Sequence, residues 1–260
     1  MEHALFDDYT ERLRTSLESA RGVVGLVVMG TTSDSTHRDQ WSDHDFWVIT
    51  EPGMQDSFVE DLSWLPDYQN IAITIKHGPR GRTILFRNRH KVEFLVFDAG
   101  EAQAGKVERY TVLIDRDRIA ELLETIHAET LRQARTRSDG LENLCVLAWS
   151  ACERYMRGEV LSARQYMDGF AVNQFLNLMR DSEADQGYRD VLDPRRRFEQ
   201  TSPELATEVL AVLNRPVPDA ALSLLQIVER ELKPKAPTLA WDKVVMVRSW
   251  ISDLRNVKGR

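Results

Sequence analysis

Apolar and polar positions in the first hundred residues are spaced as in a helix followed by strands. Apolar residues recur at every fourth position near the start of the chain, at Leu5, Tyr9, Leu13 and Leu17. This spacing predicts an amphipathic helix that ends near Gly22. The next run, 23–29, is short and rich in valine, so it predicts a strand, which stops at Gly30.

Further strand-like runs follow a polar loop over 31–42. The expected strands cover 43–50, 71–76, 83–87 and 92–97. Residues 54–66 predict a short helix after the first of these runs. Glycine, proline and asparagine in the segments between the later runs favour turns there.

Beyond about Gly100 the apolar spacing becomes helical, and we expect no strand there. The predicted helices cover 117–135, 140–157, 161–180, 203–214, 218–232 and 241–254. This order of elements predicts an α+β protein, with a small β-sheet domain flanked by helices over 1–110 and an all-helical C-terminal domain over 111–260.

The composition is that of a globular protein of 260 residues, with 42% hydrophobic residues and a formal net charge of -7. This acidic balance offers no uniform positive field that could replace counterions, so we expect no DNA binding. The chain begins without an apolar leader segment, and no apolar run approaches the ~18 residues of a membrane span. We therefore expect a cytoplasmic protein that does not bind a membrane.

The two cysteines, Cys145 and Cys152, stand seven residues apart in a predicted helix. This spacing places them two turns apart, at roughly 10 Å, which is too far for a disulfide. We expect two free thiols, as is typical of a cytoplasmic protein.

Two aspartates flank a histidine where the polar loop meets the second predicted strand, in Asp43-His44-Asp45. Alternate residues of a strand share a face, so both carboxylates point the same way, with Cα atoms roughly 6.5–7 Å apart, while His44 points the other way. Carboxylate oxygens are the ligands that Mg²⁺ prefers. The pair therefore predicts a metal site, and its structural alternative is a capped turn.

Glu93 is the one acid within the apolar run 92–97. Burying an unpaired charge in a strand is costly, so Glu93 either lies on an exposed edge or meets a positive group. Together with Asp43 and Asp45 it would complete a site for two ions roughly 3.5–4 Å apart, an arrangement that serves phosphoryl and nucleotidyl transfer.

Gly30 and Thr31 end the first predicted strand, and eleven residues separate them from Asp43. A glycine here lets the backbone approach a ligand closely, and the N–H groups of the turn together with a hydroxyl can hold phosphate oxygens. Alone, the pair is equally typical of an ordinary end of a strand, so its meaning comes from the spacing to the aspartates.

This combination resembles the nucleotidyltransferase fold of the DNA polymerase β superfamily. The shared pattern is a glycine with a small hydroxyl residue, a spacer of about ten residues, Asp-x-Asp, and a distant third acid, and it covers roughly residues 23–98. With a helical second half, the chain looks most like the antibiotic nucleotidyltransferases that act on aminoglycosides or lincosamides. The resemblance implies a mixed sheet in a catalytic domain over 1–110 and a substrate-binding role for the helical domain over 111–260.

The resemblance further implies an adenylyl-type transfer, in which a nucleoside monophosphate moves from ATP or another nucleoside triphosphate to a hydroxyl of a small molecule. Mg²⁺ would be held by Asp43 and Asp45, and Glu93 would be a further ligand, the general base, or both. Gly30, Thr31 and Ser42 would hold the phosphates.

The chain departs from the family pattern in two ways. Thr31 replaces the usual serine and keeps the hydroxyl. In addition, many relatives carry a small residue and then an arginine after the glycine-serine pair, whereas this chain has Ser33-Asp34. A cation that faces the phosphates would then come from elsewhere, and the candidates are Arg38, Lys76 and Arg80.

Candidate acceptor-binding residues in the helical half are Trp149, Glu153 and Glu159. The first two are four residues apart and so lie on one face of a helix. Acidic groups would suit a polyamine sugar, whereas the structural alternative places Trp149 in the core and leaves both acids solvated.

Two other features do not favour a different function. The run Arg195-Arg196-Arg197 has no interleaved aromatic residues, so we expect a solvated cluster and not a groove for nucleic acid. The histidines show no His-x-x-x-His spacing of the kind that binds zinc.

The sequence leaves two other functions open: transfer to a protein or tRNA acceptor, and nucleotide binding without catalysis. The acceptor, the preferred nucleotide and the oligomeric state are also left open.

Overall fold

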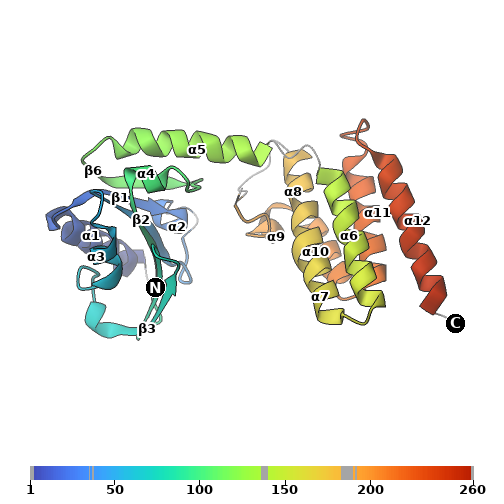
Figure 1. Ribbon diagram of the computed structural model, residues 1–260, viewed down its shortest axis with the longest axis horizontal. Helices are drawn as coiled ribbons and strands as arrows, with labels where there is room; N and C mark the ends of the chain where they lie inside the picture. The colour runs from blue at the N-terminus through green and yellow to red at the C-terminus, as the bar shows by residue number, and fades with distance from the viewer. Residues whose placement is uncertain are drawn as a thin grey trace. The chain divides into compact units, whose positions relative to one another are not determined.

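The computed structural model describes residues 3–34, 36, 38–135, 140–182, 190 and 192–258. The chain divides into two compact units, residues 1–133 and 134–260, which Figure 1 shows in blue to green and in yellow-green to red. The first unit is longer than the predicted β-sheet domain over 1–110, because a sixth strand and a long helix after it also belong to this unit.

A single mixed β-sheet forms the centre of the first unit. Its strands are β1 (Val23–Met29), β2 (His44–Thr50), β3 (Ile71–His77), β4 (Gly81–Phe86), β5 (Lys91–Asp98) and β6 (Tyr110–Asp115). They lie in the order β3-β4-β5-β2-β1-β6, and β2 and β5 are parallel while every other pair is antiparallel. The small mixed sheet is therefore confirmed, and the strands predicted from the sequence lie within a few residues of those observed.

The expectation of no strand beyond Gly100 is wrong, because β6 follows it. Its sequence, Tyr-Thr-Val-Leu-Ile-Asp, has the β-branched and aromatic residues of a strand. What makes it a strand is antiparallel pairing with β1 at the edge of the sheet, from Gly25 with Asp115 to Met29 with Tyr110.

Helices cover both faces of this sheet (Figure 1). They are α1 (His3–Ser19), α2 (Gly30–Ser33), α3 (Gln55–Glu60), α4 (Ala99–Ala102) and α5 (Ile119–Arg135), with a 3₁₀ turn at Tyr68–Asn70. Leu13 and Leu17 of α1 and Phe58 of α3 pack in the core on one face. Ile119 and Leu123 of α5 pack in the core on the other face.

The helix predicted over 54–66 is shorter than expected and ends at Glu60. Asp61 has extended backbone angles, and its carboxylate accepts hydrogen bonds from the N–H and the hydroxyl of Ser63. Such a local turn competes with helical hydrogen bonds, which explains the early end.

The described part of the second unit is built from helices. They are α6 (Gly140–Met156), α7 (Val160–Arg164), the π-helix η3 (Gln165–Ala171), α8 (Val172–Ser182), α9 (Phe198–Thr201), α10 (Pro203–Leu213), α11 (Val217–Leu232) and α12 (Trp241–Lys258). The helix expected over 161–180 therefore contains a π-helical segment. Cys145 and Cys152 lie buried in the core of this unit as free thiols, as predicted.

Within the described ranges, no helix combines the length and the apolar character that crossing a membrane requires.

Candidate active site

The pairing of β2 with β5 brings the three predicted carboxylates together. Asp45 lies opposite Glu93 in this parallel pair, and Asp43 precedes β2 on the same side as Asp45. Each of the three offers an oxygen atom, and these atoms all lie within 4.8 Å of one another. The structure thus assembles a cluster that could hold a divalent metal ion, which we call the carboxylate cluster.

His44 lies on the opposite face of the sheet, as predicted. Its ring is fully buried and stacks on Phe6 with a centroid distance of 3.7 Å. Its Nδ1 is 2.8 Å from Nε2 of His90, and its Nε2 is 3.0 Å from the hydroxyl of Thr10. Burial, and then the charge of the neighbouring histidine, lowers the pKa of His44 to about 2, and burial lowers the pKa of His90 to about 4.

These two histidines are therefore neutral in the folded protein at ordinary pH. Their contacts connect the start of β2 to α1 and to the turn before β5. These contacts hold the backbone of Asp43 and Asp45 in place.

The carboxylate cluster already contains a positive group, Lys91 at the start of β5. Its Nζ is 2.6 Å from Oδ2 of Asp43 and 3.3 Å from Oε1 of Glu93. The side chains are 43% exposed for Lys91, 18% for Asp43 and 45% for Glu93, so the cluster opens to solvent on the Glu93 side. Burial lowers the pKa of Lys91, but the hydrogen bond and charge of Asp43 outweigh it and hold that pKa above its ordinary value.

Of the two predicted explanations for an acid in the apolar run, the contact with a cation is confirmed for Glu93. The exposed edge is wrong, because β5 lies between β4 and β2 in the sheet, although the Glu93 side chain is partly exposed. Its Oε1 further accepts a hydrogen bond of 3.1 Å from the hydroxyl of Thr83 on β4. These two contacts orient the carboxylate of Glu93 within the cluster.

Gly30 carries the chain from β1 into the short helix α2 beside the cluster. Its φ of +57° lies in the left-handed region that favours glycine, and its N–H donates to the carbonyl of Arg109 at 3.2 Å. A Cβ at this position would lie 3.6 Å from Oδ2 of Asp45, so the backbone of Gly30 passes close to that carboxylate.

Thr32 joins this turn to the aspartates, a role that the sequence reasoning missed. Its hydroxyl donates to the carbonyl of Asp43 and accepts from the N–H of Asp45, both at 3.2 Å. The signal was a second hydroxyl residue directly after Thr31.

Thr31 and Ser42 lie near this turn, but the structure uses their hydroxyls differently from what was expected for phosphate contacts. The Thr31 hydroxyl is buried and has no hydrogen-bond partner among the described residues. The Ser42 hydroxyl donates to the carboxylate of Asp39 at 3.3 Å and accepts from the backbone N–H of Asp39 at 3.0 Å, so it stabilises the turn before Asp43.

Arg38, one of the candidate cations for phosphate binding, instead stabilises α2. Its guanidinium donates to the carbonyls of Thr31 at 3.2 Å and Thr32 at 3.3 Å, and it lies 4.2 Å above the ring of Phe6. The side chain is only 7% exposed, which is typical of a structural role.

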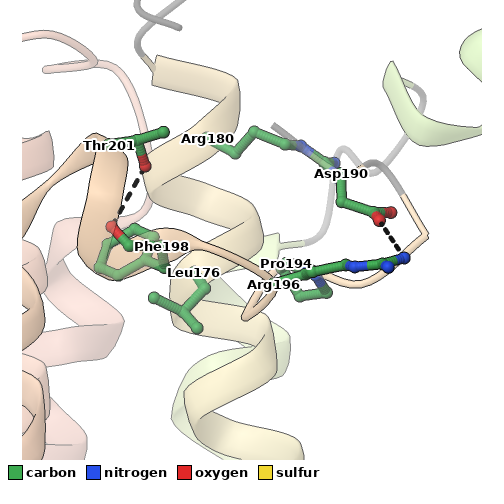
Figure 2. A pocket seen from close by; sticks show the side chains of 7 residues that line it. All are labelled: Leu176, Arg180, Asp190, Pro194, Arg196, Phe198 and Thr201. Carbon is green, nitrogen blue, oxygen red and sulfur yellow. Dashed lines mark hydrogen bonds and ion pairs between the residues drawn. The ribbon is translucent and has the colours of Figure 1, made fainter. Parts of the chain in front are cut away.

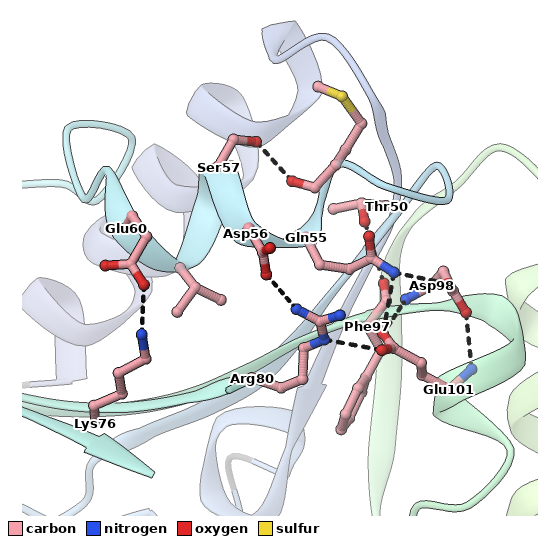
Figure 3. Close-up of polar contacts among 12 residues, drawn as sticks. Thr50, Gln55, Asp56, Ser57, Glu60, Lys76, Arg80, Phe97, Asp98 and Glu101 are labelled. Atoms are coloured by element: carbon pink, nitrogen blue, oxygen red, sulfur yellow. Dashed lines mark hydrogen bonds and ion pairs between the residues drawn. The ribbon is translucent and has the colours of Figure 1, made fainter. Parts of the chain in front are cut away.

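Lys76 and Arg80, the other two candidates, are paired with acids that do not belong to the cluster (Figure 3). Nζ of Lys76 lies 2.5 Å from Glu60, and Arg80 contacts Glu101 at 2.9 Å and Asp56 at 2.5 Å.

Besides Arg38, the structure places Lys91 beside the cluster and Arg109 beside the glycine turn. A guanidinium nitrogen of Arg109 is 3.9 Å from Oδ2 of Asp34, the residue that departs from the family pattern. Sequence reasoning missed both, although Lys91 stands two residues before Glu93 and so had to share its face of the strand.

The three predicted acceptor-binding residues lie in the second unit. Trp149 on α6 is partly buried against the helical core, and its ring lies 5.5 Å from that of Trp250. Glu153, one turn further along α6, is exposed. The carboxylate of Glu159 is held by Arg157 at 3.0 Å and Arg154 at 3.5 Å, and these contacts lower its pKa.

Two of the three consecutive arginines of the second unit stabilise local structure. Arg195 donates to the side chain of Asn173 at 2.5 Å and to two carbonyls of η3, and Arg196 pairs with Asp190 at 3.6 Å. Figure 2 shows Arg196 and Asp190 at the edge of a small hollow, which is also lined by Leu176, Arg180, Pro194, Phe198 and Thr201.

Comparisons with known proteins find likeness among solved structures alone. No protein-family model matches the chain, and no curated protein matches it. Among solved structures, the chain is similar to an aminoglycoside 6-adenyltransferase from Bacillus subtilis, with a TM-score of 0.41 and 13% sequence identity over 94% of this chain and 97% of that chain.

Proposed function

We propose that this protein is a Mg²⁺-dependent nucleotidyltransferase of the adenylyl type. It would move a nucleoside monophosphate from ATP to a hydroxyl group of a small molecule, with aminoglycoside-type compounds as the acceptor class. The observation that carries the proposal is the convergence of Asp43, Asp45 and Glu93 within 4.8 Å, beside the backbone of Gly30.

The chemistry of the cluster fits a hard divalent ion. All three potential ligands are carboxylates, which suit Mg²⁺ and not a soft metal. The ammonium of Lys91 already lies against two of them, so this position accommodates a cation. When bound, the ion would neutralise the charge that develops on the triphosphate and orient it for in-line attack.

The residues around the cluster would have separate roles in the reaction. Asp43, directly before β2, and Asp45, on β2, would hold the metal, and the glycine turn would let the triphosphate come close to Asp45 without a side chain in the way. Glu93 lies on the exposed side of the cluster, where it would take the proton of the acceptor hydroxyl, contribute a metal ligand, or do both. A positioned general base is worth about 10²–10⁴ in rate.

The helical unit is the proposed acceptor-binding part of the chain. Glu153 is exposed on α6 and would suit an amine of the acceptor, and Trp149 lies one turn before it. Glu159 is the least suited of the three predicted residues, because two arginines already neutralise its carboxylate.

The proposal is tested by incubating the full chain with labelled ATP, Mg²⁺ and a panel of aminoglycosides and lincosamides. Pyrophosphate release together with labelled small-molecule product is the expected result, and Asp43→Asn is the inactive control. Transfer of the label to protein or tRNA would overturn the small-molecule acceptor class but would support the proposed transferase activity. Nucleotide binding that is indifferent to Mg²⁺, with no product from any acceptor, would favour a non-catalytic nucleotide-binding protein instead.

A further inference from the structure

Lys91 shares its ammonium between two of the three carboxylates of the cluster. The contacts are 2.6 Å to Oδ2 of Asp43 and 3.3 Å to Oε1 of Glu93. An ammonium group offers three donors and no acceptor, so it uses the same oxygen atoms that a metal ion would need.

The position of Lys91 is fixed by strand geometry. It is the first residue of β5 and alternates with Glu93, so both side chains stand on one face of the sheet. The parallel register pairs His44 with Val92, which places Lys91 level with Asp43, one residue earlier on each strand.

A divalent ion and this ammonium cannot occupy the cluster together without strong repulsion. Like charges at such short separations repel each other, and the ammonium lies on oxygen atoms of Asp43 and Glu93 that a metal ion could use. Metal binding is therefore expected to move Lys91 away from Asp43.

The displaced side chain needs a new anionic partner at the mouth of the cluster. Lys91 is 43% exposed, so it can swing outward without disturbing the core. The polyphosphate of a nucleotide that is bound by the same metal would bring such a group, and lysine is a common phosphate ligand. The other cations considered for this task, Lys76 and Arg80, are held by acids elsewhere.

We propose that Lys91 competes with the divalent metal in the free protein and binds the nucleotide polyphosphate once the metal has displaced it. This inference rests on the proposed metal site. Lys91 then takes the role of the arginine that many relatives carry where this chain has Asp34. Metal alone binds weakly, and metal and nucleotide bind cooperatively.

The first experiment measures Mn²⁺ binding to the full chain without nucleotide, from the loss of the free-ion electron paramagnetic resonance signal. Lys91→Met and Lys91→Gln remove the competitor, and we expect both to bind Mn²⁺ about ten- to 150-fold more tightly than the wild type, the range for one lost charge-assisted hydrogen bond. Lys91→Arg keeps the charge and is expected to bind no more tightly than the wild type.

Lys76→Met is the matched control, because Lys76 is also a strand lysine, is 45% exposed and pairs with an acid. Its Mn²⁺ affinity should stay within about twofold of the wild type. Unchanged or weaker Mn²⁺ binding in Lys91→Met and Lys91→Gln would overturn the competition. Absence of Mn²⁺ binding in every variant would overturn the metal site, and the proposed function with it.

The second experiment measures the affinity for an α,β-methylene analogue of ATP at saturating Mn²⁺. Here Lys91→Met should bind about ten- to 150-fold more weakly than the wild type, and Lys91→Arg should retain most of the affinity. Tighter metal binding with weaker nucleotide binding in one variant is a pattern that general damage to the fold would not produce. Equal nucleotide affinity in Lys91→Met and the wild type would overturn the assignment of Lys91 to the polyphosphate.

Discussion

Replacing Asp43 by asparagine separates the chemistry of the carboxylate cluster from the folding of the first unit. Asparagine has almost the same shape, and the carbonyl of residue 43 keeps its hydrogen bond from Thr32. The change removes one proposed metal ligand and the 2.6 Å ion pair with Lys91.

The expected effect on stability is small. Lys91 is 43% exposed and Asp43 18%, and such partly exposed pairs contribute about 0–1 kcal/mol. Removing one of three clustered acids also relieves repulsion between like charges. For a chain of this size, a loss of 1 kcal/mol corresponds to a fall in Tm of about 2–4 °C, so we expect a shift within that range.

The expected effect on activity is large. A group that stabilises charge only in the transition state is worth about 10²–10³ in rate, and loss of a metal ligand adds weaker metal binding to this. We predict a fall of at least about 10³ in labelled transfer at fixed Mg²⁺, which is about 4 kcal/mol. Transfer by Asp43→Asn at the wild-type rate, with an unchanged melting curve, would refute the role of this residue.

Two further predictions concern the framework of the site. The free energy of unfolding should fall as the pH drops from 6.5 towards 4, because His44 and His90 stay neutral in the folded state while the unfolded chain takes up protons, at about 1.4 kcal/mol per pH unit for each histidine. Denaturant titrations at several pH values give the slope of the free energy of unfolding against pH. In His90→Gln this slope should be smaller by the contribution of one histidine, and a slope identical to that of the wild type would contradict the neutral state of His90 in the folded protein. Gly30→Ala should cost about 1–2 kcal/mol in the same titrations, because alanine is strained at a φ of +57° although its Cβ would make only an ordinary contact with Asp45. No loss would show that the turn relaxes.

Strand periodicity alone predicted much of this site. The valine-rich run 23–29 and the run after Asp43 are strands because their residues suit a pleated, buried surface, and the period of two places Asp43 and Asp45 together with His44 opposite. These are properties of neighbouring residues in the chain, so a single sequence contains them.

The remainder of the site depends on which strands become neighbours. Glu93 meets the aspartates only because β5 lies parallel to β2, with the segment from α3 to β4 inserted between them in sequence. β6 is a strand because β1 offers it a free edge. Contacts between strands far apart in sequence are set by packing of the whole sheet, and local patterns do not report them.

Side-chain partners were the least predictable feature. Thr31 and Thr32 are equivalent candidates in the sequence, but the turn directs the hydroxyl of Thr32 to the backbone of the aspartates and buries that of Thr31. Likewise Lys76 and Arg80 were reasonable phosphate ligands until the structure placed acids of α3 and α4 beside them (Figure 3).

The central claim is that the carboxylate cluster supports metal-dependent nucleotidyl transfer. The most direct measurement is pyrophosphate release from ATP in the presence of a responsive acceptor, with Mg²⁺ titrated from zero, for the wild type and Asp43→Asn. Release by the wild type should rise with Mg²⁺ and should be lost in the variant. Release that is independent of Mg²⁺, or equal in the two proteins, would contradict it.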